Sequence, residues 1–483
     1  MAIPSVNINV LDGGLGIQSP SNGDVLCFIG CSDSGTLNAP AYYTRVKDLQ
    51  AAFGGGPLVE AAAYAIETVG KPVLCARMAA TTQGGYGTIV TTGWSGTSAV
   101  TVDSAATHPN DEYDAMLKIV TGGTIGTAGI TFQYSLDGGR TMSPVTALGT
   151  ANTFAIPNSG AVTFKFAAGT AVAGDVVTCP TTAPTWGSSD LTTTLGALAV
   201  GTQSFDTIVL VGTASAADLA TLDTWCASRF AAGKFYDFVC NNVGPTSSQT
   251  DAQWQTAQQA AFASSSTTFG ECVAGYSLTR SSVSARRYRR PNSWALAARY
   301  SKIYLGQDAA EIDLGPLPGV QLGDDNGNPK EHDEAIYPGM DAARFATLRT
   351  VTGYQGVYPT NPRMMAPAGS DFIYRQFRRV MNVACAVTLQ TLTRRLSKAI
   401  RVNPKTGFIR EEDARDIEVL VNSALRTALM GKPSVSSVQF VLSRTDNVLS
   451  TFSLTGDVRL VPLGYPKQIG VTMAFNNPAI RAA

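Results

Sequence analysis

The chain has 483 residues, more than one ordinary hydrophobic core accommodates, so about two to four domains are expected. Apolar residues make up 44% of it and charged residues only 15%, which indicates a globular protein whose polar surface comes mainly from Thr, Ser, Asn and Gly. Basic and acidic residues balance at 36 each, and this removes any global electrostatic case for a nucleic acid or an anionic membrane as partner.

Neither a membrane span nor a secretion signal is expected. No run of about 18 apolar residues occurs, and the first residues lack a basic region followed by an apolar one. The eight cysteines lie mostly in apolar, strand-like segments, at positions such as Cys27, Cys75, Cys240 and Cys272. That placement is typical of buried free thiols in a reducing compartment rather than of a disulfide framework.

The first predicted elements alternate between strand and helix. Residues 25–30 read as a short apolar strand, residues 57–69 as a helix with one apolar stripe, and residues 72–77 as the next strand. The pattern breaks at Gly84 and returns near residue 207. From there we expect strands at 207–211, 235–240 and 271–276 and helices at 215–232 and 251–263. Strands separated by single helices predict a parallel or mixed sheet that is buried on both faces.

The segment between the two halves of this pattern is rich in Thr, Gly, Ser and Val. Short alternating runs recur in it, at 99–102, 116–120, 130–134 and 162–166, and turns such as Asp137-Gly138-Gly139 separate them. This is typical of an all-β, sandwich-like domain. The economical interpretation is one α/β domain, residues 25–83 and 190–350, interrupted by an inserted β-rich domain at 84–189. Two unrelated domains in series are the alternative.

Two charged segments follow. Residues 280–302 hold seven basic residues and no acid, and residues 307–341 hold nine acids and one base. They either pair, within the fold or between copies, or form separate solvated faces.

The sequence contains no recognisable catalytic or metal-binding set. Its two histidines, His108 and His332, lie in polar, loop-like sequence, and no nucleophile elbow, H-E-x-x-H motif or pair of C-x-x-C motifs occurs. No enzyme activity, metal or cofactor is therefore predicted. Two rival functions stay open: an α/β enzyme that binds a phosphorylated ligand at the glycine turn Gly54–Pro57, where backbone amides precede a helix, and a surface adhesin whose β domain binds a glycan.

The last quarter of the chain carries a helix pattern from Asp371, then a second helix from Glu411. In the first helix, Arg375, Arg378 and Arg379 share an arc opposite the apolar stripe and form a basic face suited to an acidic partner. The remaining elements are expected to be strands at 435–442 and 448–461 and an alternating, extended segment at 468–475. A similar alternating segment spans residues 3–10.

This order of elements resembles the contractile tail sheath proteins of bacteriophages and related injection machines. The resemblance is carried by Asp371–Val380 (DFIYRQFRRV), the turn ending at Asn447, Gly456–Pro462 (GDVRLVP) and the late strand at Ile469, and it covers roughly the last 110 residues. It implies an α/β and α+β multidomain protein with an N-terminal arm at 1–24, the inserted domain facing outward, a conserved sheath domain at 351–466 and a C-terminal arm at 467–483.

The resemblance further implies a structural subunit that polymerises helically around an inner tube and contracts to drive the tube through a cell envelope. Strand-like arms would link neighbouring copies through Ile3, Val6, Ile8, Val10, Ile469, Val471 and Met473. Arg375, Arg378 and Arg379 would face the tube. The implied partners are further copies of the chain, the inner tube protein, and baseplate and tail terminator proteins, in a virion tail assembled in the cytoplasm of a bacterial host, with no nucleic acid bound and no membrane insertion.

Overall fold

A six-stranded sheet forms the centre of the computed structural model, which describes residues 25–246, 248–323 and 331–475. Its strands lie in the order β16-β15-β14-β1-β3-β2, and all are parallel except β2. The strand bounds are β1 Leu26–Gly30, β2 Ala41–Tyr43, β3 Val73–Arg77, β14 Thr207–Leu210, β15 Asp237–Asn241 and β16 Gly270–Val273.

Helices cover both faces of this sheet. Successive residues of β1 point to opposite faces: Leu26 and Phe28 enter one apolar core, Cys27 and Ile29 the other. The first core is closed by α1 (Val46–Phe53), α2 (Pro57–Val69) and α6 (Asn292–Lys302). The second core is closed by α3 (Ser188–Val200), α4 (Ala216–Ala231) and α5 (Asp251–Ala261). The near-continuous apolar strands of the sequence are explained by this two-sided burial.

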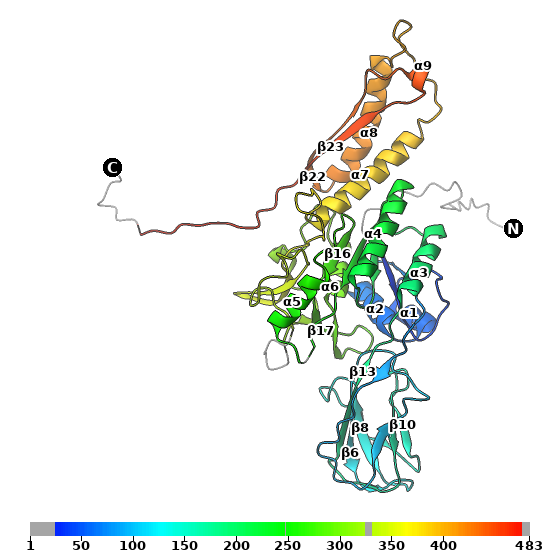
Figure 1. Ribbon diagram of the computed structural model, residues 1–483, viewed down its shortest axis with the longest axis vertical. Coiled ribbons are helices and arrows are strands. Elements are labelled where there is room, and N and C mark those ends of the chain that lie inside the picture. The colour runs from blue at the N-terminus through cyan, green and yellow to red at the C-terminus, as the bar shows by residue number, and fades with distance from the viewer. Residues whose placement is uncertain (1–24, 247, 324–330, 476–483) are drawn as a thin grey trace, which may run out of the picture.

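Ten short strands between residues 85 and 182 form sheets of their own at one end of the molecule (Figure 1). They are β4 (Gly85–Tyr86), β5 (Val100–Val102), β6 (Asp114–Thr121), β7 (Gly123–Thr124), β8 (Thr131–Ser135), β9 (Thr146–Ala147), β10 (Thr153–Ala155), β11 (Thr163–Phe166), β12 (Thr170–Ala171) and β13 (Val176–Thr182). A five-stranded sheet, β4-β13-β6-β8-β9, lies against the three-stranded sheet β10-β11-β5, and a separate apolar core lies between them. We call this part the β unit.

Smaller sheets complete the middle of the molecule. One joins β17 (Tyr276–Arg280), β18 (Arg287–Pro291) and β19 (Val320–Gln321), and the other joins β20 (Leu348–Val351) and β21 (Tyr354–Pro359). A 3-10 turn spans Ile312–Leu314. The mixed α/β architecture with several sheets agrees with the predicted fold class in these coarse terms.

The opposite end of the molecule is built by two long helices and a two-stranded antiparallel sheet (Figure 1). They are α7 (Arg375–Thr393), α8 (Glu411–Met430), β22 (Val435–Leu442) and β23 (Gly456–Pro462), with the one-turn helix α9 (Val448–Thr451) between the strands. We call this part the C-terminal unit. Its core joins the inner faces of both helices to Val438, Phe440 and Leu442 of β22.

Two boundaries in this unit differ from the sequence-based expectation. The first helix begins at Arg375 rather than Asp371, because the residues before it are held by residues 363 and 364: Ile373 accepts a hydrogen bond from the amide of Met364, and Tyr374, whose backbone is extended, bridges Arg363. The strand expected from Val448 starts only at Gly456, since Asn447 caps a helical turn by accepting the amide of Ser450. No helix among the described residues is long and apolar enough to cross a membrane.

Candidate assembly surfaces

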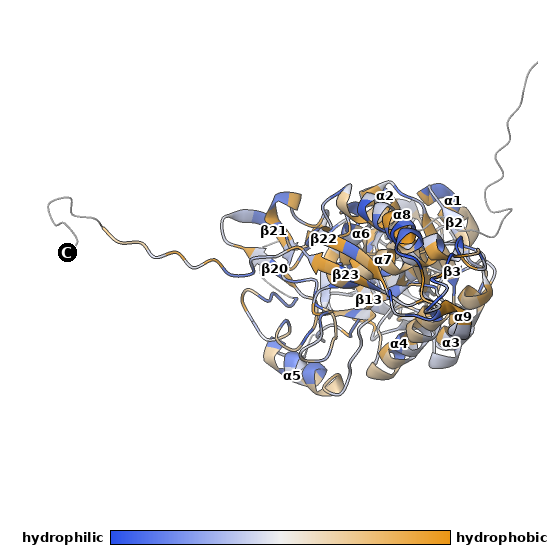
Figure 2. Ribbon diagram, turned by 90° about the horizontal axis from the view of Figure 1, so that it is seen from above, coloured by the Kyte–Doolittle hydropathy of each residue, from blue (hydrophilic) through white to orange (hydrophobic). Residues whose placement is uncertain are grey.

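The described C-terminal segment leaves the body of the molecule as an extended chain (Figures 1 and 2), and several of its apolar side chains are exposed. Ile469, Val471 and Met473 are 77%, 71% and 89% exposed, and the segment pairs with no strand among the described residues. It is anchored just before, where the Tyr465 hydroxyl donates to the Gly306 carbonyl and Lys467 pairs with Asp308. The predicted N-terminal arm residues Ile3, Val6, Ile8 and Val10 lie outside the described residues.

The β22–β23 sheet has open edges. One of its faces packs on α7 and α8, and the sheet as described contains only these two strands. An unpaired strand edge presents a row of backbone N–H and C=O groups that another extended chain can bind. The described part of the chain therefore contains an exposed extended segment and an unoccupied edge of matching chemistry.

The three arginines predicted to face a tube are buried, which corrects the expectation of an exposed basic face. Arg375, Arg378 and Arg379 are 0%, 3% and 3% exposed. Nη2 of Arg375 lies 2.5 Å from Oδ1 of Asp237, and its Nη1 lies 3.4 Å from Oε2 of Glu271. Its guanidinium also lies over the Tyr300 ring, 4.6 Å from the centroid. A side chain without exposed surface cannot contact a tube.

The neighbouring arginines pack beside Arg375, one against the residue before β16 and the other against the last turn of α6. The Arg378 guanidinium lies 3.9 Å from the centroid of the Phe269 ring, and Nη2 of Arg379 donates to the Tyr300 carbonyl at 2.9 Å. Periodicity correctly places these side chains on one face of α7. It does not show that this face docks on the amino-terminal edge of the central sheet, where Asp237 and Glu271 begin buried strands.

Burial also sets the protonation of this cluster. Removal from water raises the pKa of Glu271 to about 7, against the opposing effect of Arg375 and of the Tyr300 hydroxyl, which donates to Glu271 at 2.5 Å. The cluster therefore attaches the C-terminal unit to the sheet through charges that water does not reach.

A run of basic residues with exposed members lies instead at the tip of the C-terminal unit, in the loop between α7 and α8. Residues 394–410 contain six basic residues and no acid. Arg394, Lys398 and Lys405 are exposed, and their side chains form no ion pair among the described residues. The turn at α9 adjoins this loop (Figure 1), and Leu449 and Phe452 are exposed there. We call residues 394–410 the basic tip. The sequence does indicate this surface, because residues 394–410 form a basic run without acids. The helical periodicity of Arg375, Arg378 and Arg379 favoured those residues instead.

The glycine turn at Gly54–Pro57 is filled by the protein itself. Oδ2 of Asp33 accepts the amide of Gly55 at 3.1 Å and the side-chain amide of Asn110 at 2.7 Å. A Cβ at Gly55 would lie 2.6 Å from Nδ2 of Asn110, so close packing explains the glycine. The carboxylate at this turn disfavours a phosphate there, and the turn gives no support to the phosphorylated-ligand enzyme.

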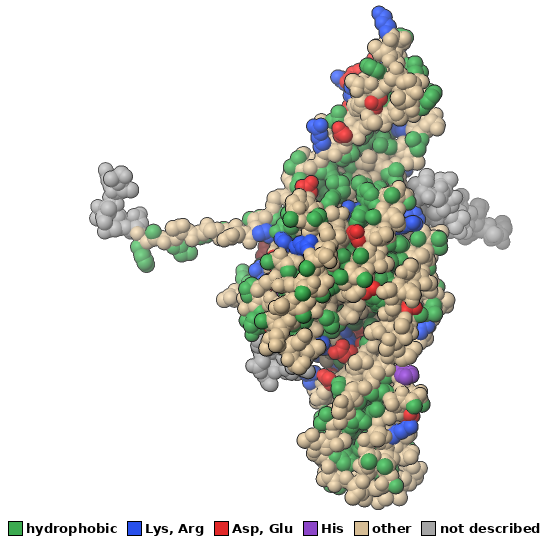
Figure 3. Space-filling model, in the orientation of Figure 1, with side chains coloured by type: hydrophobic (Ala, Val, Ile, Leu, Met, Phe, Trp, Pro, Cys, Tyr) green, Lys and Arg blue, Asp and Glu red, His purple; other side chains and the backbone are tan. Residues whose placement is uncertain are grey.

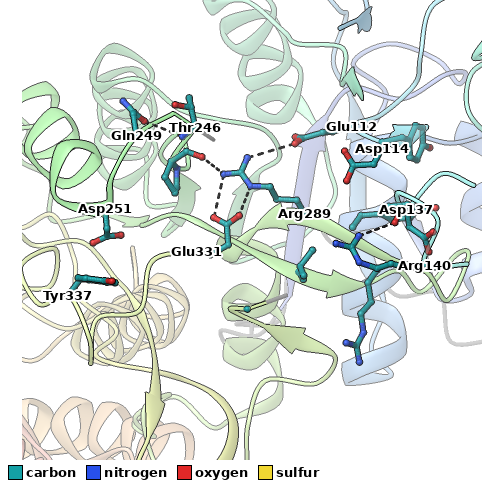
Figure 4. Close-up of a pocket in the computed structure, with 16 residues that line it drawn as sticks. Glu112, Asp114, Asp137, Arg140, Thr246, Gln249, Asp251, Arg289, Glu331 and Tyr337 are labelled. Carbon is teal, nitrogen blue, oxygen red and sulfur yellow. Dashed lines mark hydrogen bonds and ion pairs between the residues drawn. The ribbon is translucent and has the colours of Figure 1, made fainter. Parts of the chain in front are cut away.

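The basic and acidic segments pair within the chain at the junction between the β unit and the body. Nε of Arg289 lies 2.6 Å from Oε1 of Glu331, and its Nη1 lies 3.8 Å from Glu112 of the β unit (Figure 4). Nη2 of Arg290 lies 2.8 Å from Oδ2 of Asp111, and both side chains are almost fully buried. Arg289, Arg290 and Glu331 therefore hold parts of the chain together and do not belong to separate solvated faces.

His332 is enclosed in a comparable way and has no free nitrogen for catalysis. Its Nδ1 lies 3.1 Å from Asp251 and its Nε2 lies 2.9 Å from Glu334. Burial opposes protonation of the ring, but the hydrogen bond to Glu334 and the charge of Asp251 raise the pKa of His332 above its ordinary value. Among the described residues, no group of histidine, cysteine and carboxylate side chains is arranged to hold a metal ion.

Solved structures with the same fold include subunits of contractile machines. A chain of the anti-feeding prophage (AFP) baseplate shares 9% identity, with 99% of each chain covered and a TM-score of 0.52. A chain of the contracted sheath complex of PVC, an extracellular contractile injection system, shares 10% identity, with 98% of each chain covered and a TM-score of 0.51. The sheath tail protein of Desulfitobacterium hafniense shares 11% identity over 95% of this chain and 100% of its own, with a TM-score of 0.48.

The first two similarities show that the fold is shared over nearly the whole chain. They confirm, for the fold, the resemblance that the last quarter of the sequence suggested. No curated protein matches the sequence. The model of the DUF2586 N-terminal domain matches residues 3–363, or 361 of the 483 residues, and the chain therefore belongs to the DUF2586 family.

Proposed function

We propose that this protein is the structural subunit of a contractile sheath, which polymerises helically around an inner tube and shortens to drive that tube through a cell envelope. The observation that carries the proposal is the fold shared, over 98% of both chains, with a subunit of a sheath complex in its contracted state. Each copy also carries the two surfaces that a polymer needs: an exposed C-terminal segment that can add as a strand, and an open edge of the β22–β23 sheet that can receive one.

The finer architecture is part of the proposal. We assign residues 1–24 and 467–483 to linking arms, residues 25–83 and 190–350 to an interrupted α/β domain, residues 84–189 to the inserted β domain and residues 351–466 to the sheath domain. The β unit, with its own core at the far end of the long axis from the C-terminal unit, would face outward (Figure 1). Sparse surface charge (Figure 3) suits a subunit that is covered by its neighbours.

In the polymer, the C-terminal segment would add a strand to the β22–β23 sheet of another copy. Backbone hydrogen bonds along the edge would supply affinity, and the apolar side chains of Ile469, Val471 and Met473 would supply register. The residues Ile3, Val6, Ile8 and Val10 would form the matching N-terminal link. Such links keep copies connected while their rigid bodies move.

The basic tip is the surface that we propose for contact with the tube, in place of the buried arginines. Arg394, Lys398 and Lys405 are exposed and unpaired within the described chain, so an acidic surface of the tube would complement them. Baseplate and tail terminator proteins would bind the ends of the polymer. We place the assembly in a phage tail built in the cytoplasm of a bacterial host. Co-purification with filled capsids distinguishes this setting from a free injection machine.

Negative-stain electron microscopy of the purified protein tests the function. The expected result is long tubes or stacked, striated rings, and a protein that stays a discrete monomer at high concentration would contradict the proposal. Deletion of residues 468–483 should abolish the tubes while the circular dichroism spectrum and the melting temperature stay those of the full chain. Ordered tubes formed by the truncated chain would refute the role of the arm.

A further inference from the structure

A phenylalanine ends the one-turn helix α9 in a backbone conformation that glycine usually takes. The amide of Phe452 donates to the Val448 carbonyl, and its φ of 51° and ψ of 26° lie in the left-handed region. Glycine is the usual residue at such a helix end, because a Cβ is crowded there by the neighbouring backbone. Of the described non-glycine residues with positive φ, Phe452 alone has an aromatic side chain.

The rest of the chain does not cover this ring. Phe452 is 88% exposed, and Leu449, three residues earlier in the same turn, is 62% exposed. Val448 and Leu454, by contrast, pack against the core of the C-terminal unit. A strained backbone that holds two apolar side chains in water is unfavourable for an isolated subunit, and backbone strain of this kind concentrates at binding and switch sites. The turn therefore indicates a contact with another molecule.

The α9 turn is held against the basic tip. The Val448 amide donates to the Gly407 carbonyl at 3.2 Å, and Asn447 bridges Phe408. The approach is so close that a Cβ at Gly407 would overlap the Asn447 side chain. The exposed Lys405 stands two residues before Gly407. The apolar turn and the basic tip thus form one surface at the end of the molecule (Figure 1).

Most acids at this end are engaged within the chain. The ion pairs are those of Glu411 with Arg415 and Arg444, and of Glu412 and Asp413 with Arg401. Oδ2 of Asp446 accepts the amide of Thr455 at 2.6 Å. Asp416 and Asp457 are exposed, but they belong to α8 and β23 rather than to the two loops of the tip. The surface therefore combines the unpaired charge of the basic tip with two apolar side chains.

We propose that Phe452 and Leu449 are the apolar anchor of the tube contact, and that the tube protein receives them in an apolar pocket bordered by acidic side chains. The inference rests on the proposed sheath function, in which the basic tip faces the tube. The lysines would orient the contact and make it depend on salt, whereas burial of the ring would hold it when salt screens the charges.

An anionic membrane also binds surfaces that combine basic and aromatic residues. It fits this surface less well than a protein pocket does. The Glu412 side chain is 75% exposed at the same end, and a uniformly anionic plane would repel it together with Asp416. A pocket with a local acidic border avoids both carboxylates and needs only two apolar side chains to fill it.

Biolayer interferometry with immobilised, purified tail tubes tests the anchor, using the full chain at concentrations at which it is monomeric. Binding should persist in part when the salt is raised from about 0.05 M to about 0.5 M, which shortens the screening length to a few ångströms. Phe452→Asn should weaken binding about tenfold at both salt concentrations, through loss of the buried ring. Leu449→Ser should act in the same direction.

The matched control is Tyr354→Asn, which removes an aromatic side chain that is 59% exposed at the start of β21, away from the tip. It should leave tube binding unchanged. Asparagine tolerates the left-handed conformation, so Phe452→Asn should keep or raise the melting temperature. A lower melting temperature would overturn the proposal, because the ring would then stabilise the fold rather than a contact.

The remaining outcomes separate the anchor from the sheath function. If the unaltered chain binds the tubes and Phe452→Asn binds them equally well, the anchor is refuted and the sheath function stands. If the unaltered chain fails to bind at either salt concentration, both are refuted. Binding of the unaltered chain, but not of Phe452→Asn, to vesicles of phosphatidylcholine and phosphatidylglycerol would overturn the assignment to the tube in favour of a membrane.

Discussion

At the scale of single residues, buried charges hold the parts of this protein together. Arg375 links α7 to Asp237 and Glu271, and Arg290 links β18 to Asp111 of the β unit. Removing both charges of an ion pair from water costs free energy, and this cost offsets most of the Coulomb attraction between them. A buried pair therefore adds little net stability. Removing one partner is costly all the same, since the other charge stays buried alone. These arginines therefore set where the units lie.

Arg375→Met should destabilise the protein by about 3–5 kcal/mol, because the carboxylate of Asp237 would remain buried without its cation. Urea unfolding followed by circular dichroism measures the change. Lys405→Met at the exposed basic tip is the control and should shift the free energy of unfolding by about 0.5 kcal/mol or less. Similar effects of the two substitutions would contradict the structural role of Arg375.

The raised pKa of Glu271 has a consequence for pH. The folded protein retains a proton on Glu271 up to about pH 7, whereas the unfolded chain loses it near the ordinary pKa of 4.5. Between these two pH values the folded state therefore binds more protons than the unfolded chain. The contribution of Glu271 to the free energy of unfolding is greatest below pH 4.5 and decreases as the pH rises to 7. Glu271→Gln, which keeps an acceptor for Tyr300, should flatten this part of the stability profile. A slope unchanged by the substitution would exclude Glu271 as its source.

At the scale of elements, the alternation in the C-terminal segment decides which side chains enter an interface. Residues 469, 471 and 473 share one face of a strand, and Thr472 lies on the other. Val471→Asp should abolish tubes in electron microscopy, whereas Thr472→Asp, with the same charge, should retain them. Loss of tubes in both variants would indicate that charge in this segment, rather than strand register, prevents assembly.

The basic tip makes an electrostatic prediction. Lys398→Glu with Lys405→Glu should reduce binding of the sheath subunit to purified tail tubes in co-sedimentation, and the reduction should be smaller at high salt, since exposed charges are screened. Lys47→Glu with Lys118→Glu changes the net charge by the same amount on other exposed surfaces. If this control pair reduces binding equally, net charge rather than the tip explains the effect.

At the scale of the whole molecule, the central sheet organises both ends. The C-terminal unit docks on its amino-terminal edge through Arg375, and the β unit docks at its carboxyl edge through Asn110, which binds Asp33 after β1. Asp111 adds a second attachment, to Arg290 of β18. The two units therefore lie at opposite ends of the long axis (Figure 1). This arrangement leaves the described part of the C-terminal segment and the basic tip away from the β unit (Figure 1).

Arg290→Met should loosen the β unit without unfolding the central sheet. It leaves Asp111 buried without its cation, and burial already raises the pKa of Asp111 to about 7. Limited proteolysis should then cut the connections at 79–84 and 183–187 faster than in the unaltered protein, while the core fragments persist. Cleavage within the central helices at equal rate would show general destabilisation instead.

The sequence by itself determined the local elements, because the periodicity of a helix or a strand depends only on residues a few positions apart in the chain. The helix at Pro57–Val69 agrees with its predicted bounds, and the parallel strands of the central sheet agree to within three residues, whereas the short antiparallel strand β2 (Ala41–Tyr43) was not predicted. The alternation of apolar residues at 469–473 is visible in the sequence. Only the tertiary structure decided which faces these elements cover. Arg375, Arg378 and Arg379 form a basic face on α7 in any helical projection, yet they are buried because Asp237 and Glu271 meet them from strands far away in the chain. The cavity between the carboxyl edge of the central sheet and the β unit has the same origin, since the order of strands in the sheet brings its walls together from separate segments of the chain.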